Sequence, residues 1–470
     1  MSRTDVIVLG GGAAGEHCAG ALAGHGANVL LVERELVGGE CSYWACVPSK
    51  TLLRAGEAVH AARAAGAHAQ VDVEAALAWR DFMVSGGSDA GQERWLADAG
   101  VSLVRGDGVL TGPGSVQVGG EHHTAEHVVI ATGSEVFVPP IPGLADLEGV
   151  WTNREATSMT SVPRRLVVLG AGPVGVELAQ AVRRLGGEVV VVGNDPRVLP
   201  REPARLGAAV GDALTRDGVE LVLGARVTGA RRSGPDVVLD LDGGREVRGD
   251  RLLVATGRRP RVRGIGLERV GVEPDPRGIQ VDHRLRAGDG LWAVGDVTGI
   301  AQLTHVGKYQ ADVAVANILG GYRSASYTAV PRVVFTDPQA AAVGATEDWF
   351  SGTADLAGVP RLATYTREYA TSSGFLTLLS DGSRLTGAYG VGPEAGEWLQ
   401  QATLAIRARV PLDLLADTIQ PFLTFSEIYI AALGSLMHAI RNDPSHPIEA
   451  LTAHRPGTPA RTRAPRGPAR

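Results

Sequence analysis

Residues 6–15 read VIVLGGGAAG, an apolar run that leads directly into a glycine-rich turn. Residues 166–175 read LVVLGAGPVG and repeat this organisation at an offset of 160 positions. A small-residue segment of helical character follows each turn, and then comes a second β-rich run, at residues 29–32 and 189–192. The order strand, glycine turn, helix, strand is that of the βαβ unit that binds a mononucleotide. We therefore predict two such units in one chain.

The glycines of the two turns are spaced alike, and each position has a physical role. The first permits the tight turn, the second lets the backbone approach a pyrophosphate, and the third allows the helix to pack closely on the strand. The N-terminus of the helix then faces the anionic phosphates. The predicted binding positions are Gly10, Gly12, Ala13, Ala14 and Gly15 in the first unit, and Gly170, Gly172, Val174 and Gly175 in the second.

The two units differ at the end of their second strand. Glu33 ends this strand in the first unit, where a carboxylate can accept hydrogen bonds from an adenosine ribose. Gly193 stands at the equivalent position of the second unit, which therefore lacks the acid that normally selects NAD and repels a 2′-phosphate. The choice between NADH and NADPH stays open. The arginines that we consider as partners of a 2′-phosphate are Arg183, Arg184, Arg197 and Arg201.

Further short strands are expected to close the nucleotide-binding units. Residues 128–133 read VVIATG and residues 252–257 read LLVATG, so each apolar run ends in a glycine turn. Residues 291–296 read LWAVGD, and the Asp296 carboxylate at the end of this strand is suited to bind a ribityl or ribose hydroxyl. Alternation over residues 115–123 predicts a β-hairpin. We expect additional cofactor contacts at Gly108, Thr132, Gly133, Ser134 and Gly257.

The sequence pattern changes at about Val330. β-rich runs at residues 332–335, 374–379 and 385–389 alternate with helical runs at residues 394–407 and 426–440. This alternation favours a third domain of α+β type. The predicted fold class is α/β, with two Rossmann-like dinucleotide-binding domains and a C-terminal α+β domain.

The composition excludes several classes of function. The 470 residues are 44% hydrophobic and 20% charged, which is typical of a globular protein. The net charge is −6 and no long basic run precedes the extreme C-terminus, so nucleic acid is a poor candidate partner. No apolar run approaches the ~20 residues that cross a bilayer, and no signal-peptide pattern opens the chain. We expect a soluble cytoplasmic protein with no membrane partner.

The cysteines are few, and two of them are close together. Cys41 and Cys46 are separated by four residues, and helical character begins near Pro48, because proline is favoured in the first turn of a helix. The positive end of that helix and the nearby Lys50 favour a thiolate at Cys46. We predict redox chemistry for this pair and a buried, inert role for Cys18. No metal is expected, because no second cysteine pair completes a zinc site.

These motifs resemble those of the FAD-dependent pyridine nucleotide–disulphide oxidoreductases, which include dihydrolipoamide dehydrogenase, glutathione reductase and mercuric reductase. The resemblance covers nearly the whole chain up to about residue 445. It rests on the two glycine units, the cysteine motif and the strands that end in glycine. Further matches are RRP at residues 258–260, FTDP at residues 335–338 and VGPEAGE at residues 391–397.

The resemblance implies the cofactors and the route of the electrons. FAD would occupy the first unit, with Asp296, Gly39 and Thr304 among its contacts, and NAD(P)H would occupy the second. Electrons would pass from NAD(P)H through FAD to a redox-active disulfide between Cys41 and Cys46, and then to a small-molecule electron acceptor.

Two further properties follow from the same resemblance. Lys50 and Glu177 look like the family's lysine–glutamate pair beside the flavin ring, although an acid in the first turns of a helix also suits the helix dipole when it is solvated. The third domain would form a homodimer in which each active site is built from both subunits.

The expected domains follow from these assignments. The FAD-binding domain comprises residues 1–150 and returns at residues 263–328. The NAD(P)-binding domain lies between these segments, at residues 151–262. The interface domain spans residues 329–448, and residues 449–470, rich in Pro, Arg, Thr and Ala, form a disordered tail.

One position departs from the family. Its disulfide reductases carry His-Pro-Thr-x-x-Glu near the C-terminus, where the histidine is the acid/base and the glutamate orients it. Phe422 stands in place of that histidine, while Glu427 is retained. Phenylalanine cannot transfer a proton, and losing a positioned acid/base costs ~10²–10⁴ in rate. Tyr429 and His438 are conceivable substitutes, but we favour helix packing for both.

Other readings of the departure stay open. Mercuric reductase has tyrosine in place of the histidine, but it also needs a C-terminal cysteine pair, and this chain has no cysteine after Cys46. A ketopropyl coenzyme M oxidoreductase/carboxylase has phenylalanine there. The leading hypothesis is an NAD(P)H-dependent reductase that acts through Cys41. The alternatives are direct transfer from flavin to a quinone or similar acceptor, and a non-catalytic component that carries flavin.

Overall fold

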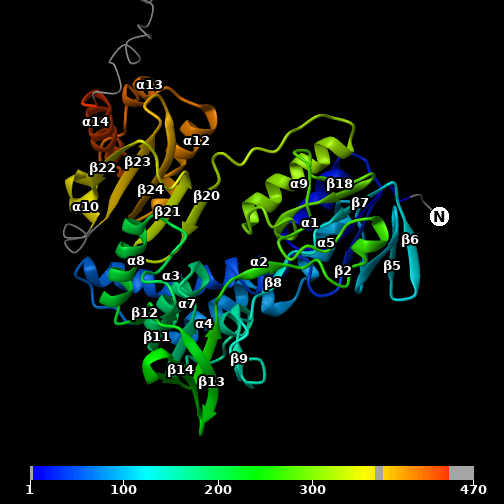
Figure 1. Ribbon diagram of the computed structural model, residues 1–470, viewed down its shortest axis with the longest axis horizontal. Helices are drawn as coiled ribbons and strands as arrows, with labels where there is room; N and C mark the ends of the chain where they lie inside the picture. Colours follow the sequence, from blue (N-terminus) through cyan, green and yellow to red (C-terminus); the bar gives the residue numbers. More distant parts are fainter. Residues whose placement is uncertain (1–3, 366–373, 444–470) are drawn as a thin grey trace, which may run out of the picture.

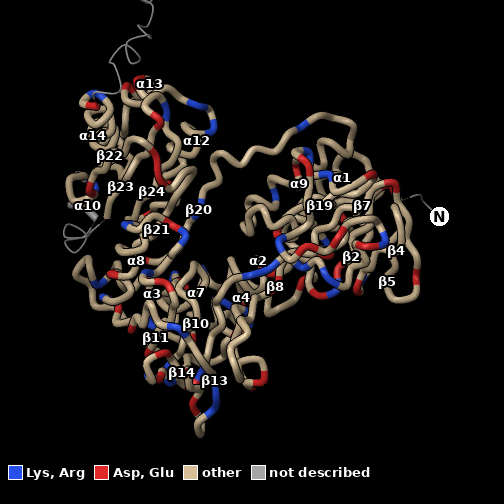
Figure 2. Tube along the Cα trace, viewed as in Figure 1, with Lys and Arg blue, Asp and Glu red and all other residues tan. Residues whose placement is uncertain are grey.

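The computed structural model of the protein describes residues 4–365 and 374–443, so the expected tail at residues 449–470 lies outside the described residues. Three large sheets organise these residues, and Figure 1 shows them as three groups of elements. Charges of both signs are interspersed over all three groups (Figure 2). No helix of the described segments combines the length and the apolar character that crossing a bilayer requires.

The first sheet has the strand order β18-β19-β7-β1-β2-β3, and only the β18–β19 pair is antiparallel. Its central strands are buried on both faces, as a parallel sheet requires, while the edge strands β3 and β18 are partly exposed. Helices α1 (Ala13–Gly24) and α9 (Thr304–Ile318) pack together over one face. The strands are β1 (Val6–Leu9), β2 (Val29–Glu33), β3 (Ser102–Arg105), β7 (His127–Ile130), β18 (Arg286–Gly288) and β19 (Leu291–Ala293).

A small antiparallel sheet covers the other face of the first sheet. It contains β4 (Gly108–Gly112), β5 (Ser115–Val118) and β6 (Glu121–Thr124). The β5–β6 pair confirms the predicted hairpin.

The second sheet repeats the parallel design in the order β12-β11-β10-β16-β9. One face carries α7 (Pro173–Arg184), α8 (Ala204–Arg216) and the long helix α3 (Cys46–Ala64). The opposite face carries an antiparallel sheet of β13 (Val227–Ser233), β14 (Asp236–Leu241) and β15 (Glu246–Gly249). The strands are β9 (Val150–Trp151), β10 (Arg165–Leu169), β11 (Glu188–Gly193), β12 (Glu220–Leu223) and β16 (Arg251–Val254).

Short elements complete the two nucleotide-binding units. A two-stranded antiparallel link joins β8 (Ser134–Val136) to β17 (Arg258–Pro260). The remaining helices of this part are α2 (Gly39–Tyr43), α4 (Val73–Met83), α5 (Ala90–Asp98) and α6 (Asn153–Thr157).

The third sheet is antiparallel, in the order β20-β21-β24-β23-β22. The predicted strands correspond to β20 (Pro331–Val334), β23 (Phe375–Ser380) and β24 (Leu385–Gly392). Two strands were not predicted, β21 (Gln339–Gly344) and β22 (Phe350–Asp355), because their alanine, glycine and serine content has low β propensity.

Helices of the third group partly match the predicted runs. The run predicted at residues 394–407 is divided into α11 (Ala395–Trp398) and α12 (Gln400–Ala408). The run at 426–440 corresponds to α14 (Ile428–Arg441), which packs on β22 and β23. The remaining helices are α10 (Pro360–Tyr365) and α13 (Leu412–Ala416).

Candidate active site

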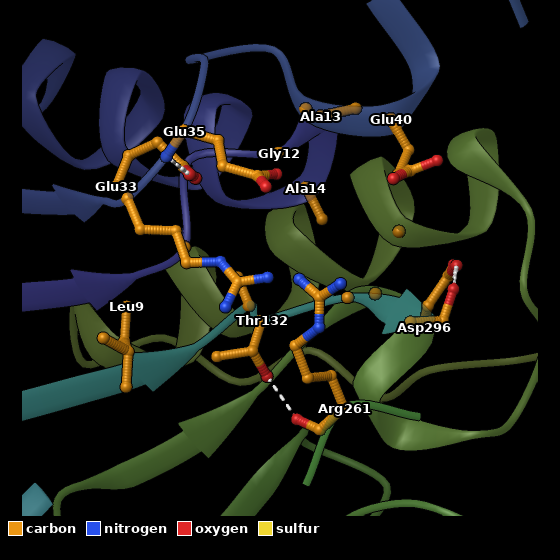
Figure 3. A pocket seen from close by; sticks show the side chains of 18 of the residues that line it. Leu9, Gly12, Ala13, Ala14, Glu33, Glu35, Glu40, Thr132, Arg261 and Asp296 are labelled. Atoms are coloured by element: carbon orange, nitrogen blue, oxygen red, sulfur yellow. Dashed lines mark hydrogen bonds between the residues drawn. The ribbon is translucent and has the colours of Figure 1, made fainter. Parts of the chain in front are cut away.

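A pocket opens at the carboxyl ends of β1, β2 and β7, where ligands bind in open α/β sheets (Figure 3). The structure gathers most of the predicted FAD-site residues on its wall. Those residues are Gly10, Gly12, Ala13, Ala14, Glu33, Gly39, Gly108, Thr132, Gly133, Ser134, Asp296 and Thr304, and Cys41 joins them.

The glycine turn of the first unit has the geometry that a phosphate cradle requires. Gly10 has φ of +106°, and a Cβ there would lie 2.4 Å from the Ala131 carbonyl oxygen. A Cβ on Gly15 would lie 1.9 Å from the Gly10 carbonyl oxygen, so Gly15 lies behind the pocket and lets α1 approach the strand. Gly12 caps α1 and has nothing within 4 Å of its Cβ position, which leaves open space beside the N-terminus of the helix.

Two carboxylates and the N-terminus of α1 are among the polar groups of this pocket. Oε2 of Glu33 accepts a hydrogen bond from the Gly11 amide at 2.6 Å, which fixes the side chain at the end of β2. Asp296 accepts a hydrogen bond from the Ser134 hydroxyl at 2.6 Å, and burial raises the pKa of its carboxyl group. Open space at a helix N-terminus, flanked by oriented carboxylates, fits the phosphates and hydroxyls of FAD.

Arginines at the mouth of the pocket were not predicted. Arg34, Arg154 and Arg261 line it, and Figure 3 shows Arg261 reaching across the opening. The Arg154 guanidinium lies 4.0 Å from the centre of the Trp44 ring. Arg34 follows Glu33 directly, and Arg261 follows the RRP motif. Their positions next to these motifs could have indicated that they line the cofactor pocket.

The two cysteines lie on consecutive helices. Cys41 is in α2, and Cys46 is the first residue of α3, two positions before the predicted start at Pro48. Both are free thiols in the structure, and the Cys46 sulfur lies 3.4 Å from the Thr304 hydroxyl. Cys18 is completely buried, as predicted, and burial raises the pKa of its thiol to about 12.

The environment gives the two thiols opposite properties. A hydrogen bond with Cys41 is the main cause that lowers the pKa of Cys46 to about 6, and the Thr304 hydroxyl and the Lys50 charge add to it. The same hydrogen bond raises the pKa of Cys41. The surroundings therefore favour the thiolate at Cys46 and the protonated thiol at Cys41.

Lys50 and Glu177 form the expected pair. Lys50 Nζ lies 2.6 Å from Glu177 Oε2, and Glu177 is 5% exposed, so it is not a solvated acid of the first turns. Oε1 of Glu177 accepts a hydrogen bond from the Phe335 amide at 2.8 Å. Lys50 Nζ also lies 4.8 Å from the centre of the Phe335 ring. Segments far apart in sequence thus meet beside Cys46.

A second ionic cluster follows along the same helices. Asp337 accepts hydrogen bonds from Arg184 of α7 at 2.7 Å and contacts His60 of α3 at the same distance. Gln180 binds both backbone polar groups of Asp337, at 2.7 and 2.9 Å. Arg184 also binds Asp217 at 2.9 Å. This cluster fixes the FTDP segment between α3 and α7.

The second unit reproduces the glycine geometry of the first. Gly170 has φ of +115°, and a Cβ on Gly175 would lie 2.0 Å from the Gly170 carbonyl oxygen. Gly172 caps α7 with open space at its Cβ position, and Val174 is exposed in the first turn. Gly193 ends β11, and Gly257 has φ of +118° in the turn after β16.

Three of the four arginines that we considered for a 2′-phosphate are engaged elsewhere. Arg184 is held in the Asp337 cluster. Arg183 donates to the Gly187 carbonyl and Arg197 to the Pro200 carbonyl. The expectation is therefore wrong for Arg184, because two carboxylates bind its guanidinium. Arg201 is exposed.

Phe422 and Glu427 lie in the segment between α13 and α14 of the C-terminal group. Figure 1 shows these two helices far from α2 of the same chain. Phe422 is 72% exposed. Glu427 accepts a hydrogen bond from the Leu423 amide at 2.9 Å and so holds the loop that carries Phe422. Tyr429 is fully buried and donates to the Trp398 carbonyl at 3.0 Å, which confirms its packing role.

The layout is that of a flavin-dependent disulfide reductase fold: two parallel sheets with glycine turns, a dithiol beside the pocket of the first sheet, and a C-terminal antiparallel sheet. The family model of the pyridine nucleotide-disulphide oxidoreductases matches residues 4–311, and the model of their dimerisation domain matches residues 330–432. The chain belongs to this family. It is an FAD-dependent NAD(P)H oxidoreductase, and its dimerisation domain supports a homodimer.

Relatives and solved structures agree with this assignment. Dihydrolipoyl dehydrogenase of Thermus scotoductus is 35% identical over 455 residues, covering 93% of this chain and 98% of that protein. A mercuric reductase of Acidithiobacillus ferrooxidans is 36% identical over 448 residues, covering 90% and 80% respectively. The HOCl-induced flavoprotein disulfide reductase RclA of Escherichia coli, solved also as a Cu(II) complex, superposes with a TM-score of 0.81 at 26% identity, covering 92% of this chain and 99% of that one.

Proposed function

We propose that electrons pass from NAD(P)H through FAD to a Cys41–Cys46 disulfide, and from the resulting dithiol to a small electrophilic acceptor. The main support is the hydrogen-bonded pair in which the pKa of Cys46 is held to about 6. The acceptor is reduced without the C-terminal histidine of many relatives, because Phe422 occupies that position. The proposed compartment is the cytoplasm, where reducing conditions suit a catalytic dithiol better than a structural disulfide.

Residues of both glycine turns and two carboxylates would bind the cofactors. When bound, FAD supplies the electron relay between the nicotinamide and the dithiol. Gly12 and the N-terminus of α1 would hold its pyrophosphate, while Glu33 and Asp296 would accept hydrogen bonds from its hydroxyl groups. Gly172 and the N-terminus of α7 would bind the nicotinamide nucleotide in the same way.

The two sulfurs of the dithiol have different roles in the proposed reaction. For a disulfide acceptor, Cys41 passes its proton to Cys46 and attacks one sulfur of the acceptor, whose S–S bond breaks and releases the other sulfur as a thiolate. Cys46 then releases the proton to solvent. Cys46 then attacks the Cys41 sulfur, expels the second thiolate and restores the Cys41–Cys46 disulfide. The dithiol is oxidised by two electrons and the acceptor is reduced by two. Each leaving thiolate needs a proton or a cation, and Phe422 provides neither.

The homodimer is proposed to complete this site. Several large apolar side chains are exposed on the C-terminal group, and burying such side chains against a second copy is favourable. They include Leu404, Leu414, Ile419, Phe422 and Ile430, of which Ile419 is 93% exposed. We place the Phe422 loop of one subunit against the dithiol of its partner, because Phe422 and the cysteines lie far apart within one chain.

The test is steady-state turnover of the FAD-loaded protein with NADH and with NADPH against disulfides, quinones, Hg(II) and Cu(II). Cu(II) belongs in the panel because RclA was solved with it, and Hg(II) because several relatives are mercuric reductases. Each acceptor is assayed with wild type and with Cys41→Ser. The proposal expects Cys41→Ser to lose at least ~10²-fold on the best acceptor.

A second candidate is direct electron transfer from flavin to a quinone. The observation that favours it is Phe422, since a quinone does not require an acid for a leaving thiol. Alkylating the reduced thiols separates the two candidates. Loss of turnover supports the dithiol route, and full turnover with blocked thiols supports the direct route.

A further inference from the structure

The chain contains two lysines, Lys50 and Lys308, against 43 arginines. Both lysines act electrostatically on the cysteine pair, Lys50 on Cys46 and Lys308 on Cys41. Lys50 belongs to the ion pair with Glu177 already described. Lys308 has no place in the cofactor sites and is not part of any motif noted in the sequence.

Lys308 lies on the face of α9 that begins at the dithiol. It follows Thr304 by four residues, which places both side chains on one face with a rise of ~6 Å between them. Thr304 contacts the Cys46 sulfur at 3.4 Å. One further turn along, Asp312 binds His17 of α1 at 2.7 Å. Thr304, Lys308 and Asp312 therefore form a row on α9 that starts beside the Cys46 sulfur and ends where α9 contacts α1.

The groups around Lys308 give it charged neighbours of the opposite sign. Glu16 of α1 is half-buried; burial raises the pKa of its carboxyl group, and Lys308 and His17 oppose that shift. Asp312 is already bound to His17. Lys308 itself is exposed, so its ammonium reaches solvent, and its charge acts to lower the pKa of the Cys41 thiol and of the Glu16 carboxyl group.

We propose that Lys308 is the cation that stabilises the thiolate leaving a disulfide acceptor at Cys41, a role that Phe422 cannot fill. The inference rests on the proposed function, in which Cys41 is the sulfur that meets the acceptor. As Cys41 bonds to one acceptor sulfur, the S–S bond of the acceptor breaks and its electron pair stays on the departing sulfur. The Lys308 ammonium donates a hydrogen bond to that sulfur, and the product takes its proton from water after it departs.

The expected size of the effect follows from similar charge-stabilising groups. Removing one hydrogen-bond donor from a developing anion typically costs ~10²–10³ in kcat. Arginine keeps the charge and a donor, so it is expected to restore most of the loss that methionine causes. The effect is restricted to acceptor reduction, because Lys308 does not contact the nicotinamide site.

The experiment compares Lys308→Met, Lys308→Arg and the control Arg216→Met in the FAD-loaded protein. Arg216 is an exposed cation at the end of α8, so its loss removes one charge at a distance. Two readouts are taken: turnover on dithiobis(nitrobenzoate) as the disulfide probe, and the pH dependence of Cys41 alkylation in a Cys46→Ser background, mapped by mass spectrometry. Flavin reduction by NAD(P)H is followed separately by stopped flow.

We expect Lys308→Met to lower disulfide turnover by ~10² and to shift the Cys41 alkylation midpoint to higher pH, with Lys308→Arg close to wild type in both. Flavin reduction should be unchanged in all three variants. An alkylation midpoint of Lys308→Met equal to that of Arg216→Met overturns the inference, whatever the acceptor proves to be. Full turnover by Cys41→Ser overturns the proposed function instead, and the alkylation readout still reports on Lys308.

Discussion

Lys50 Nζ lies 2.6 Å from Glu177 Oε2, and this contact joins the helix that begins at Cys46 to the helix that follows the second glycine turn. The other Glu177 oxygen accepts the Phe335 amide at 2.8 Å. These contacts fix Cys46 relative to both nucleotide-binding units and to the segment around Phe335 that leads into the C-terminal domain. One ion pair sets both the position and the charge beside Cys46.

Replacing Lys50 by methionine is expected to raise the pKa of Cys46 above about 6. The Lys50 charge is one of the causes that lower this pKa, while Glu177 opposes it, so the variant leaves the carboxylate unbalanced. A rise of one unit slows alkylation of Cys46 about tenfold below pH 6, and the difference shrinks as the pH rises through the new pKa. Alkylation rates from pH 5 to 9 measure the shift.

Arg54→Met is the matched control for this variant. Arg54 lies one turn further along the same helix, and its side chain is 66% exposed in a pair with Glu57. An equal effect of both variants would show that charge on α3 in general, and not the Lys50 contact, controls Cys46.

Asp337→Asn is expected to destabilise the protein by about 3 kcal/mol, because Arg184 and His60 lose a buried partner. Burial alone raises the pKa of Asp337, but the His60 hydrogen bond and the Arg184 charge outweigh it and lower the pKa to about 2. The folded-state pKa lies below the unfolded value of ~3.9. The stabilisation is therefore present above pH ~4 and is lost as the pH falls through about 2.

Urea unfolding of wild type and Asp337→Asn at pH 7 and at pH 3 tests this linkage. The difference between the two proteins should be smaller at pH 3. Asp289→Asn serves as a control, since the Asp289 side chain is fully exposed. A difference that does not change with pH would contradict the assignment of the stabilisation to the Asp337 carboxylate.

Gly12→Ala is expected to lose flavin binding, whereas Gly15→Ala is expected to impair folding. A Cβ on Gly12 meets nothing within 4 Å, so the variant should fold with an unchanged apoprotein Tm, but its methyl group enters the proposed pyrophosphate cradle. A Cβ on Gly15 lies 1.9 Å from a carbonyl oxygen and forces α1 away from β1, so this variant should fold poorly. Flavin content per chain and circular dichroism distinguish the two. Full flavin content in Gly12→Ala would argue against the cradle.

Phe422→His is expected to increase turnover on disulfide acceptors, by up to ~10²-fold, because it supplies an acid/base beside the retained Glu427. The gain should follow a bell-shaped pH profile that wild type lacks. Phe422→Tyr is the control, since it keeps an aromatic ring without an imidazole. No gain with histidine would mean that the Phe422 loop does not reach the dithiol of the partner subunit.

Local sequence patterns were enough to predict the main elements of the fold. They were not enough to predict how segments far apart in the sequence pack together. The two glycine turns were predictable because each requires positive φ and close backbone approach at fixed spacing, which few residue types allow. β21 escaped prediction because an alanine-rich strand is stabilised by its neighbours and not by its own propensity.

The parts of the site that could be predicted are those in which the required residue types lie close together in the sequence. Cys46 and Lys50 belong to one short segment, so their proximity is local. The Asp337 cluster joins residues separated by 153 and 277 positions, and no local signal announces such contacts. The position of Lys308 relative to the cysteines likewise depends on the contact between Thr304 and the Cys46 sulfur, which the sequence alone does not indicate.

The most direct test of the dithiol route is the turnover of Cys41→Ser with NAD(P)H and the best acceptor from the panel, measured beside its rate of flavin reduction. We expect flavin reduction at the wild-type rate and a loss of acceptor turnover of at least ~10²-fold, because electrons reach the flavin but the sulfur that meets the acceptor is missing. Wild-type turnover in Cys41→Ser would contradict the route through Cys41 and assign acceptor reduction to the flavin itself.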